Sequence, residues 1–167
     1  MRKSKINISG FKIGTAENRE GLTGVTVILA PDGGATAGVD VRGCAPGTRE
    51  TDLLDPRKTV QKIHAVVLSG GSAFGLEAAS GCVKYLAEQG VGFPIGNVCV
   101  PIVCSAVLFD LMIGDEKAYP DLLMGYEAAK SASSEFLSGC NGAGTGATVG
   151  KLLGFGNAMK RDRKSTR

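Results

Sequence analysis

A glycine-rich stretch that ends in a lysine, NGAGTGATVGK from Asn141 to Lys151, is the first segment that could do chemistry. A phosphate-binding Walker loop needs two glycines separated by four residues, the second followed by Lys and then by Ser or Thr. Here Gly146 and Gly150 are separated by three residues, and Leu152 stands where the hydroxyl that binds Mg²⁺ should be. The spacing therefore argues against a nucleotide site and leaves open what the loop binds.

A second candidate is SGGSAFG, Ser69 to Gly75, which joins an expected strand to an expected helix. Its glycines allow a tight turn and could leave backbone N–H groups pointing at an anion or an oxyanion, although a plain turn is equally compatible with them. Ser72 fits the G-x-S-x-G nucleophile elbow poorly, because Phe74 stands at the fifth position counted from Gly70.

The only histidine, His64, lies inside an apolar run, and we interpret it as a core residue and not as a catalytic base. A Ser-His-Asp triad is therefore not expected. A hydroxyl nucleophile on this chain would need another base, and a free N-terminal amine is one that can activate its own Ser or Thr.

Composition narrows the classes of protein to consider. The chain has 167 residues, 43% of them hydrophobic, which predicts one globular domain with a real core. The formal net charge of +3 comes from the last seven residues, RDRKSTR, so a basic nucleic-acid-binding face is not expected. Because there is neither an apolar run of membrane-spanning length nor a signal peptide, we expect no membrane span and a cytoplasmic location.

The cysteines do not form a metal-binding pattern. There is no C-x-x-C pair and only one histidine to assist, so we expect no metal and no other cofactor. We expect the thiols to be reduced and mostly small core residues. The cysteines are Cys44, Cys82, Cys99, Cys104 and Cys140.

The elements that must position the two candidate segments follow from hydrophobic periodicity. Residues 22–30 and 36–43 are β-branched runs separated by PDGG, which predicts an antiparallel hairpin. Residues 62–70 are nearly all apolar, which predicts a strand buried on both faces. In residues 91–115 the prolines predict short strands and an extended crossing.

Two helices are also predicted. From Gly70 to Gly90 the spacing becomes helical, with Phe74, Ala78 and Cys82 on one side and a stop at Gly90. Residues 120–133 predict the second helix.

Four blocks of the chain together resemble the successive signature segments of the self-processing L-aminopeptidase/D-esterase-amidase family, which includes the β-aminopeptidases and the nylon-oligomer hydrolases. The resemblance runs from about Lys12 to Lys160 in unbroken order. The blocks are LTGVTVILAPDGGATAGVDVRGCAPGTRETDLLDP, VLSGGSAFGLEAASG, PIVCSAVLFDLMIGD and NGAGTGATVGK.

The resemblance implies an α/β fold, namely a four-layer α/β/β/α sandwich. It also implies a single precursor that cleaves itself before a Ser or Thr, which then becomes the N-terminal nucleophile. Such an enzyme hydrolyses the amide or ester bonds of small peptides with no metal or organic cofactor.

The resemblance assigns roles to residues of both candidate segments. Lys151 matches the lysine that lies beside the nucleophile, where its charge can stabilise an oxyanion or lower the pKa of an amine. Phe109 stands where many relatives carry a Tyr whose hydroxyl can donate to the oxyanion, and a Phe cannot donate. The residues matched to the cleft lining are Gly70, Gly71, Ser72, Ala73, Phe109, Asn141, Gly144, Thr145 and Gly146.

Two other features of the resembling segments stay open. Cys44 replaces a glycine usual in its block, and its small size suggests packing more than catalysis. The charged turn GTRETDLLDP, residues 47–56, could be an ion-pair turn or a loop that faces substrate.

The end of the chain departs from the resemblance. In the family the lysine is followed by further strands, a catalytic asparagine, the cleavage point and a β segment that carries the nucleophile. We therefore expect a partial α segment over residues 1–160, an atypical basic tail over 161–167, and no nucleophile in this chain.

Two consequences are expected from such a truncation. The isolated chain should not hydrolyse substrate. It should also be aggregation-prone, form a homo-oligomer through exposed sheet surface, or be stable only with the missing β segment as a partner. The alternative is a non-catalytic binding or assembly module that retains half of the hydrolase fold.

Overall fold

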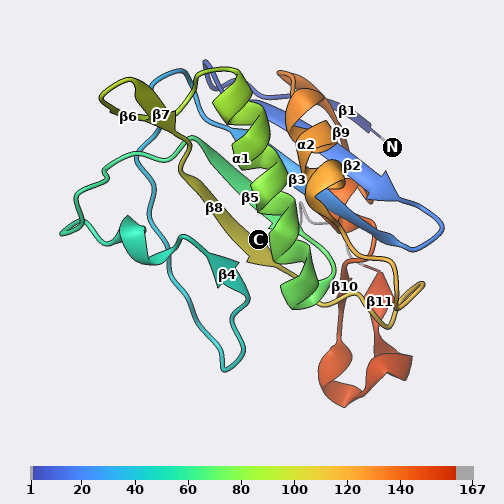
Figure 1. Cartoon of the computed structure of the whole chain (residues 1–167). Coiled ribbons are helices and arrows are strands. Elements are labelled where there is room, and N and C mark those ends of the chain that lie inside the picture. Colours follow the sequence, from blue (N-terminus) through green and yellow to red (C-terminus); the bar gives the residue numbers. More distant parts are fainter. Residues whose placement is uncertain (1, 161–167) are drawn as a thin grey trace.

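The structure is a computed structural model that describes residues 2–160, so the basic tail over 161–167 lies outside the described residues. Its centre is a five-stranded sheet with the strand order β2-β3-β5-β8-β4 (Figure 1). Strands β5 and β8 are parallel, and the other neighbours are antiparallel. The bounds are Lys12–Asn18 for β2, Thr23–Leu29 for β3, Thr48–Arg49 for β4, Ala65–Ser69 for β5 and Val103–Val107 for β8.

Three small two-stranded ribbons and two helices complete the described chain. Helices α1 and α2 lie side by side over one face of the central sheet (Figure 1). The helices span Ala78–Glu88 (α1) and Leu122–Lys130 (α2), and the ribbons pair β1 (Arg2–Lys5) with β9 (Glu135–Ser138), β6 (Phe93–Ile95) with β7 (Val98–Val100), and β10 (Thr148–Val149) with β11 (Met159–Lys160). Single 3-10 turns span Asp52–Leu54, Gly142–Gly144, Lys151–Leu153 and Phe155–Asn157, and a longer 3-10 segment spans Ser72–Glu77.

The core lies between the sheet and the helices. Alternate sheet residues such as Val25, Val27 and Val67 are completely buried there, against small helix residues such as Ala78 and Cys82. This burial confirms the α/β class, and the helix layer and the sheet layer correspond to two layers of the expected sandwich.

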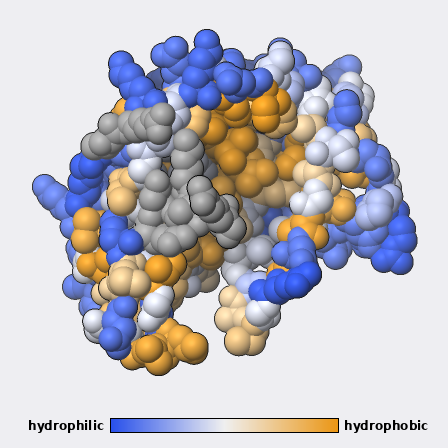
Figure 2. Space-filling view, turned by 180° about the vertical axis from the view of Figure 1, so that it is seen from behind, coloured by the Kyte–Doolittle hydropathy of each residue, from blue (hydrophilic) through white to orange (hydrophobic). Residues whose placement is uncertain are grey.

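The opposite sheet face is only half-buried. Thr26, Ile28 and Leu68 alternate with the buried valines and therefore point away from the helices. Figure 2 views the molecule from behind, and apolar residues colour the hollowed middle of that side. The prediction that residues 62–70 are buried on both faces is wrong, because in the described residues only one face of β5 is fully covered.

The predicted hairpin is also wrong. Residues 23–29 form β3, but its partners are β2 and β5, and residues 36–43 form no strand. The partner β2 brings Gly14 close to α2, where an added Cβ would lie 1.9 Å from the carbonyl oxygen of Ala128. Residues 19–22 join β2 directly to β3, and β5 pairs with the other edge of β3, an arrangement that the PDGG turn does not reveal.

The helix predictions are confirmed with one exception. Helix α2 begins after Asp121, whose side chain accepts a hydrogen bond from the backbone N–H of Met124 at 2.8 Å. Helix α1 ends before Gly90, which has φ of 67°. Phe74, however, is 59% exposed, because residues 72–77 are wound as a 3-10 segment and its side chain does not follow the α-helical face.

The short strands predicted within residues 91–115 are present as β6, β7 and β8. None of the helices in the part of the chain that the structure describes combines the length and apolarity needed to cross a bilayer.

The cysteines are free thiols, but the prediction that most of them are core residues is wrong. Cys82 and Cys104 are buried, and burial raises the pKa of Cys82 to about 12 and that of Cys104 to about 11. Cys44, Cys99 and Cys140 are exposed, because the loops and the ribbon that carry them lie outside the core.

Candidate functional site

Three loops meet beyond the carboxyl ends of the parallel strands β5 and β8. The turn at residues 70–73 follows β5, residues 108–110 follow β8, and Asp110 contacts both that turn and Gly146 of the glycine-rich loop at residues 141–150. The crevice at the carboxyl ends of parallel strands is a common ligand site in α/β proteins. The fold thus brings together the two segments that the sequence singled out.

Lys151 extends across this junction. It is half-buried, and its Nζ donates a hydrogen bond of 2.6 Å to the backbone carbonyl oxygen of Phe109. The ammonium also lies 6.0 Å from the centre of the Phe109 ring, which in turn contacts the ring of Phe155 at 5.9 Å. Among the described residues Lys151 makes no ion pair.

The backbone amides of the turn after β5 are directed into the protein. The N–H of Gly70 donates to the carbonyl of Gly24 at 2.9 Å, and that of Ser72 donates to the carbonyl of Leu108 at 3.0 Å. Between them, the N–H of Gly71 donates to Asp110 Oδ1 at 2.6 Å. For these three amides the plain-turn interpretation is therefore supported, since none is free to receive an anion. The next residue, Ala73, is exposed.

The glycine-rich loop likewise uses its amides internally. The N–H of Gly142 donates to the Glu17 carboxylate at 3.1 Å, and that of Ala143 donates to the Thr26 hydroxyl at 3.2 Å. The amides of residues 144–145 bond to carbonyls of the loop itself. A phosphate cradle needs these groups to point outward, so the geometry agrees with the failed Walker spacing.

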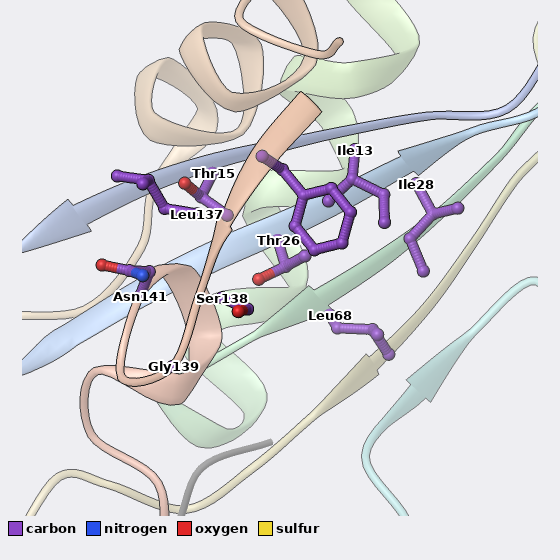
Figure 3. Close-up of a pocket in the computed structure, with 10 residues that line it drawn as sticks. Ile13, Thr15, Thr26, Ile28, Leu68, Leu137, Ser138, Gly139 and Asn141 are labelled. Carbon is purple, nitrogen blue, oxygen red and sulfur yellow. The ribbon is translucent and has the colours of Figure 1, made fainter. Parts of the chain in front are cut away.

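Asn141 lies at the start of the loop and lines a cavity of about 240 Å³ between β9 and the open sheet face (Figure 3). Its Oδ1 accepts a hydrogen bond from Arg19 at 3.2 Å, which fixes the orientation of the amide. Its buried Nδ2 has no partner within the described residues. The cavity is lined by Ile13, Thr15, Thr26, Ile28, Leu68, Phe136, Leu137, Ser138, Gly139 and Asn141.

The remaining matched residues, Gly144, Thr145 and Gly146, are buried inside the loop. The hydroxyl of Thr145 has no partner among the described residues. The role of these residues in lining a cleft stays a prediction.

Sequence reasoning missed the buried Asp110. Its carboxylate is 2% exposed and accepts hydrogen bonds from Gly71 and from the hydroxyl of Thr23. The available signal was an acid directly after the apolar run AVLF, at the end of a strand. Glu17 and Arg19 form hydrogen bonds with the start of the glycine-rich loop, and no feature of the sequence around them pointed to this contact.

The interpretation of His64 as a core residue is confirmed. It is 4% exposed, and its Nδ1 accepts a hydrogen bond from the backbone N–H of Ile102 at 3.1 Å. Burial lowers the pKa of this imidazole. Because Nδ1 is already occupied, that nitrogen is not available as a base.

The charged segment after β4 contains ion pairs. Asp55 and Arg57 lie 2.5 Å apart, and the hydrogen bonds from Arg57 lower the pKa of Asp55 to about 2. Asp52 lies 3.4 Å from Lys58, whereas Arg49 donates to the hydroxyl of Ser80. Of the acids in residues 47–56, Asp52 and Asp55 thus form ion pairs with the following Lys58 and Arg57, and the alternative that this loop faces substrate stays a prediction. Among the described residues no cluster of His, Cys, Asp and Glu could hold a metal ion.

Comparison with known proteins adds an independent observation. The family described as peptidase family S58 matches residues 5–161. An uncharacterized aminopeptidase of Mycobacterium tuberculosis (strain ATCC 25618 / H37Rv) is 47% identical over 131 residues, which cover 78% of this chain and 38% of the relative. A 6-aminohexanoate-oligomer endohydrolase of Kocuria sp. (strain KY2) is 36% identical over 165 residues, which cover 94% of this chain and 44% of the relative.

The fold is similar to that of a solved enzyme. The L-aminopeptidase D-Ala-esterase/amidase of Ochrobactrum anthropi, described as a variant of the Ntn hydrolase fold, superimposes with a TM-score of 0.63 at 18% identity. The match covers 83% of this chain and 42% of that enzyme. The chain therefore spans less than half the length of each of these three proteins.

Proposed function

Because the chain belongs to peptidase family S58, we propose that it forms part of a hydrolase that cleaves the amide or ester bonds of small peptides and related amides. The relatives named as an aminopeptidase and as a 6-aminohexanoate-oligomer endohydrolase support this class of reaction. We propose that the reaction needs no metal or organic cofactor.

The observation that carries the proposal is the position of the Lys151 ammonium, which makes no ion pair within residues 2–160. It is held 2.6 Å from the Phe109 carbonyl, at the junction of the glycine turn and the glycine-rich loop. A fixed positive charge in a partly buried site stabilises the oxyanion that forms when a nucleophile attacks a carbonyl carbon. The same charge lowers the pKa of a nearby amine, which keeps that amine free to act as a base.

In this proposal the nucleophile is a Ser or Thr outside the described site, freed at a chain N-terminus by self-cleavage. Its hydroxyl oxygen bonds to the substrate carbonyl carbon while the hydroxyl proton passes to its own α-amine. The carbon–nitrogen bond then breaks, the leaving amine takes the proton, and water releases the acyl group. The described residues contribute Lys151 and the two loops that hold it.

The test compares the purified chain with the complete product of its gene, using amino-acid p-nitroanilides and 6-aminohexanoate oligomers as substrates. For whichever preparation turns over, we expect Lys151→Ala to lower kcat by about 100-fold or more, the scale measured for removing one oxyanion-stabilising group. The exposed Lys117→Ala is the matched control and should leave kcat unchanged.

The chain alone should show no turnover, and mass spectrometry should find the active preparation cut before a Ser or Thr into two segments that stay assembled. Absence of hydrolysis in both preparations would reject the proposed function. Hydrolysis by a single uncut polypeptide would reject the self-cleaving mechanism.

A further inference from the structure

One buried carboxylate lies where the candidate loops meet. Asp110 follows β8 and is 2% exposed. Its Oδ1 accepts the N–H of Gly71 at 2.6 Å, and its Oδ2 accepts the hydroxyl of Thr23 at 2.8 Å. We propose that Asp110 is a positioning residue that sets the turn after β5 relative to Lys151, an inference that rests on the proposed function for its catalytic consequence.

Both glycine segments pack directly against the Asp110 carboxylate. A Cβ added to Gly70 would lie 2.1 Å from Asp110 Oδ2, and one added to Gly146 would lie 2.4 Å from the same oxygen. No side chain fits at either position without displacing the acid. The two candidate loops are therefore packed on one oxygen atom, and their separation is set by the position of Asp110.

The turn that Asp110 holds has an unfavourable backbone conformation. Gly71 has φ of 76°, and Ser72, which has a Cβ, has φ of 51°. Residues other than glycine rarely adopt positive φ, and they keep it where the surrounding contacts enforce it. Residues 108–110 supply these contacts. The Asp110 carboxylate accepts a hydrogen bond from the N–H of Gly71, and the carbonyl of Leu108 accepts one from the N–H of Ser72.

The same short segment also holds the lysine. The backbone carbonyl of Phe109 accepts the hydrogen bond from Lys151 Nζ, and Asp110 is the next residue along the chain. The peptide group that orients the ammonium is thus adjacent to the side chain that orients the turn. Asp110 acts through these neighbours, because its own oxygens are occupied by Gly71 and Thr23.

The choice of an acid is explained by its partners. Both groups that face the carboxylate donate hydrogen bonds, and an ionised carboxylate is an acceptor at both oxygens. Hydrogen bonds to an ionised acceptor are shorter and stronger than neutral ones, which agrees with the 2.6 Å distance to Gly71.

The first test measures backbone amide hydrogen exchange on the isotope-labelled chain, for Asp110→Ala, Asp110→Asn and the control Asp115→Asn. The control is matched because the exposed Asp115 also accepts a backbone N–H, that of Lys117 at 2.9 Å. We expect Asp110→Ala to speed exchange at Gly71 and Ser72 by about tenfold or more, the loss expected for one hydrogen bond to a charged group. Val27 and Val67 in the sheet should keep their protection.

Asp110→Asn keeps a neutral acceptor and should restore most of the protection, with exchange at Gly71 about twofold faster than in the unchanged chain. If Asp110→Ala does not fold, this smaller and local increase decides the question. Unchanged exchange at Gly71, or an equal rise at Val27 and Val67, would overturn the proposal, because the acid would then be an ordinary core residue.

The second test uses the preparation that hydrolyses substrate. Asp110→Ala should misplace the turn and Lys151. It should therefore lower kcat and leave KM within about twofold, since the lost interactions belong to the transition state. Asp110→Asn should recover most of kcat, and Asp115→Asn should have no effect. An increase in KM alone would overturn the catalytic part. If no preparation is active, the proposed function fails, while the exchange measurement still tests the positioning role.

Discussion

His64 is a buried imidazole whose protonation the fold opposes. It is 4% exposed, its Nδ1 accepts the backbone N–H of Ile102, and burial lowers its pKa from the ordinary value of 6.5. The unfolded chain, in which the ring is hydrated, binds the proton more readily than the folded chain does. The contribution of His64 to stability is therefore complete above pH 6.5 and is lost as the pH falls below it.

We predict that the free energy of unfolding falls between pH 6.5 and pH 5.5, by no more than about 1.4 kcal/mol per pH unit, the limit for one titrating group. Urea denaturation at several pH values measures it. His64→Asn keeps an acceptor near the position of Nδ1 without a ring that binds a proton. The free energy of unfolding of this variant should therefore change less with pH over this range. Equal slopes in the two chains would show that other groups cause the loss.

At the scale of elements, helices α1 and α2 touch backbone to backbone. A Cβ added to Gly81 would lie 1.9 Å from the carbonyl oxygen of Leu122, and one added to Gly125 would lie 1.9 Å from that of Ala78. Glycine lowers the intrinsic stability of a helix interior by about 1 kcal/mol relative to alanine. The two glycines are therefore explained by the close packing of the helices and not by helix propensity.

We predict that Gly81→Ala lowers the free energy of unfolding by about 1–3 kcal/mol, because the overpacking cost exceeds the propensity gain. Gly38→Ala is the control, since no atom lies within 4 Å of the added Cβ and its φ is not positive, so it should change stability by no more than about 0.5 kcal/mol. Chemical denaturation measures both. A Gly81→Ala chain as stable as the unchanged one would mean that the helices separate at little cost.

At the scale of the whole molecule, the described residues cover one sheet face with helices and leave apolar side chains of the other accessible (Figure 2). Ile28, Val66 and Leu68 are half-buried on that face, next to the cavity beneath β9. Large accessible apolar surfaces on soluble proteins tend to be covered by a partner.

We predict that the isolated chain associates through this face, so that sedimentation velocity shows larger species as the concentration rises. Leu68→Glu places a charge on the face and should shift the chain toward monomer. The control, Leu123→Glu, changes a residue of α2 that is 63% exposed and should leave association unchanged. A monodisperse monomer with a cooperative, concentration-independent melt would contradict the prediction.

Elements whose signals are local could be predicted from the sequence. The helical spacing of residues 78–88 and 122–130 and the apolar run of β5 are contained in short windows, where side-chain periodicity decides the structure. The partner of β3 could not be predicted in this way. The pairing of β3 with β5 joins segments that are far apart in the sequence, and no short window contains it.

For the candidate site, the sequence alone determined which residue types are present: two glycine segments, one lysine after them, and no arrangement suited to a Walker loop or a histidine-based triad. Only the tertiary structure decided which way the backbone amides of those segments point. Their N–H groups turn inward, onto Glu17, Thr26 and Asp110, whose side chains come from three separate strands or strand ends. The physical reason is that a glycine permits many backbone conformations, so the direction of each peptide group is fixed by long-range hydrogen-bond partners that the local sequence does not contain.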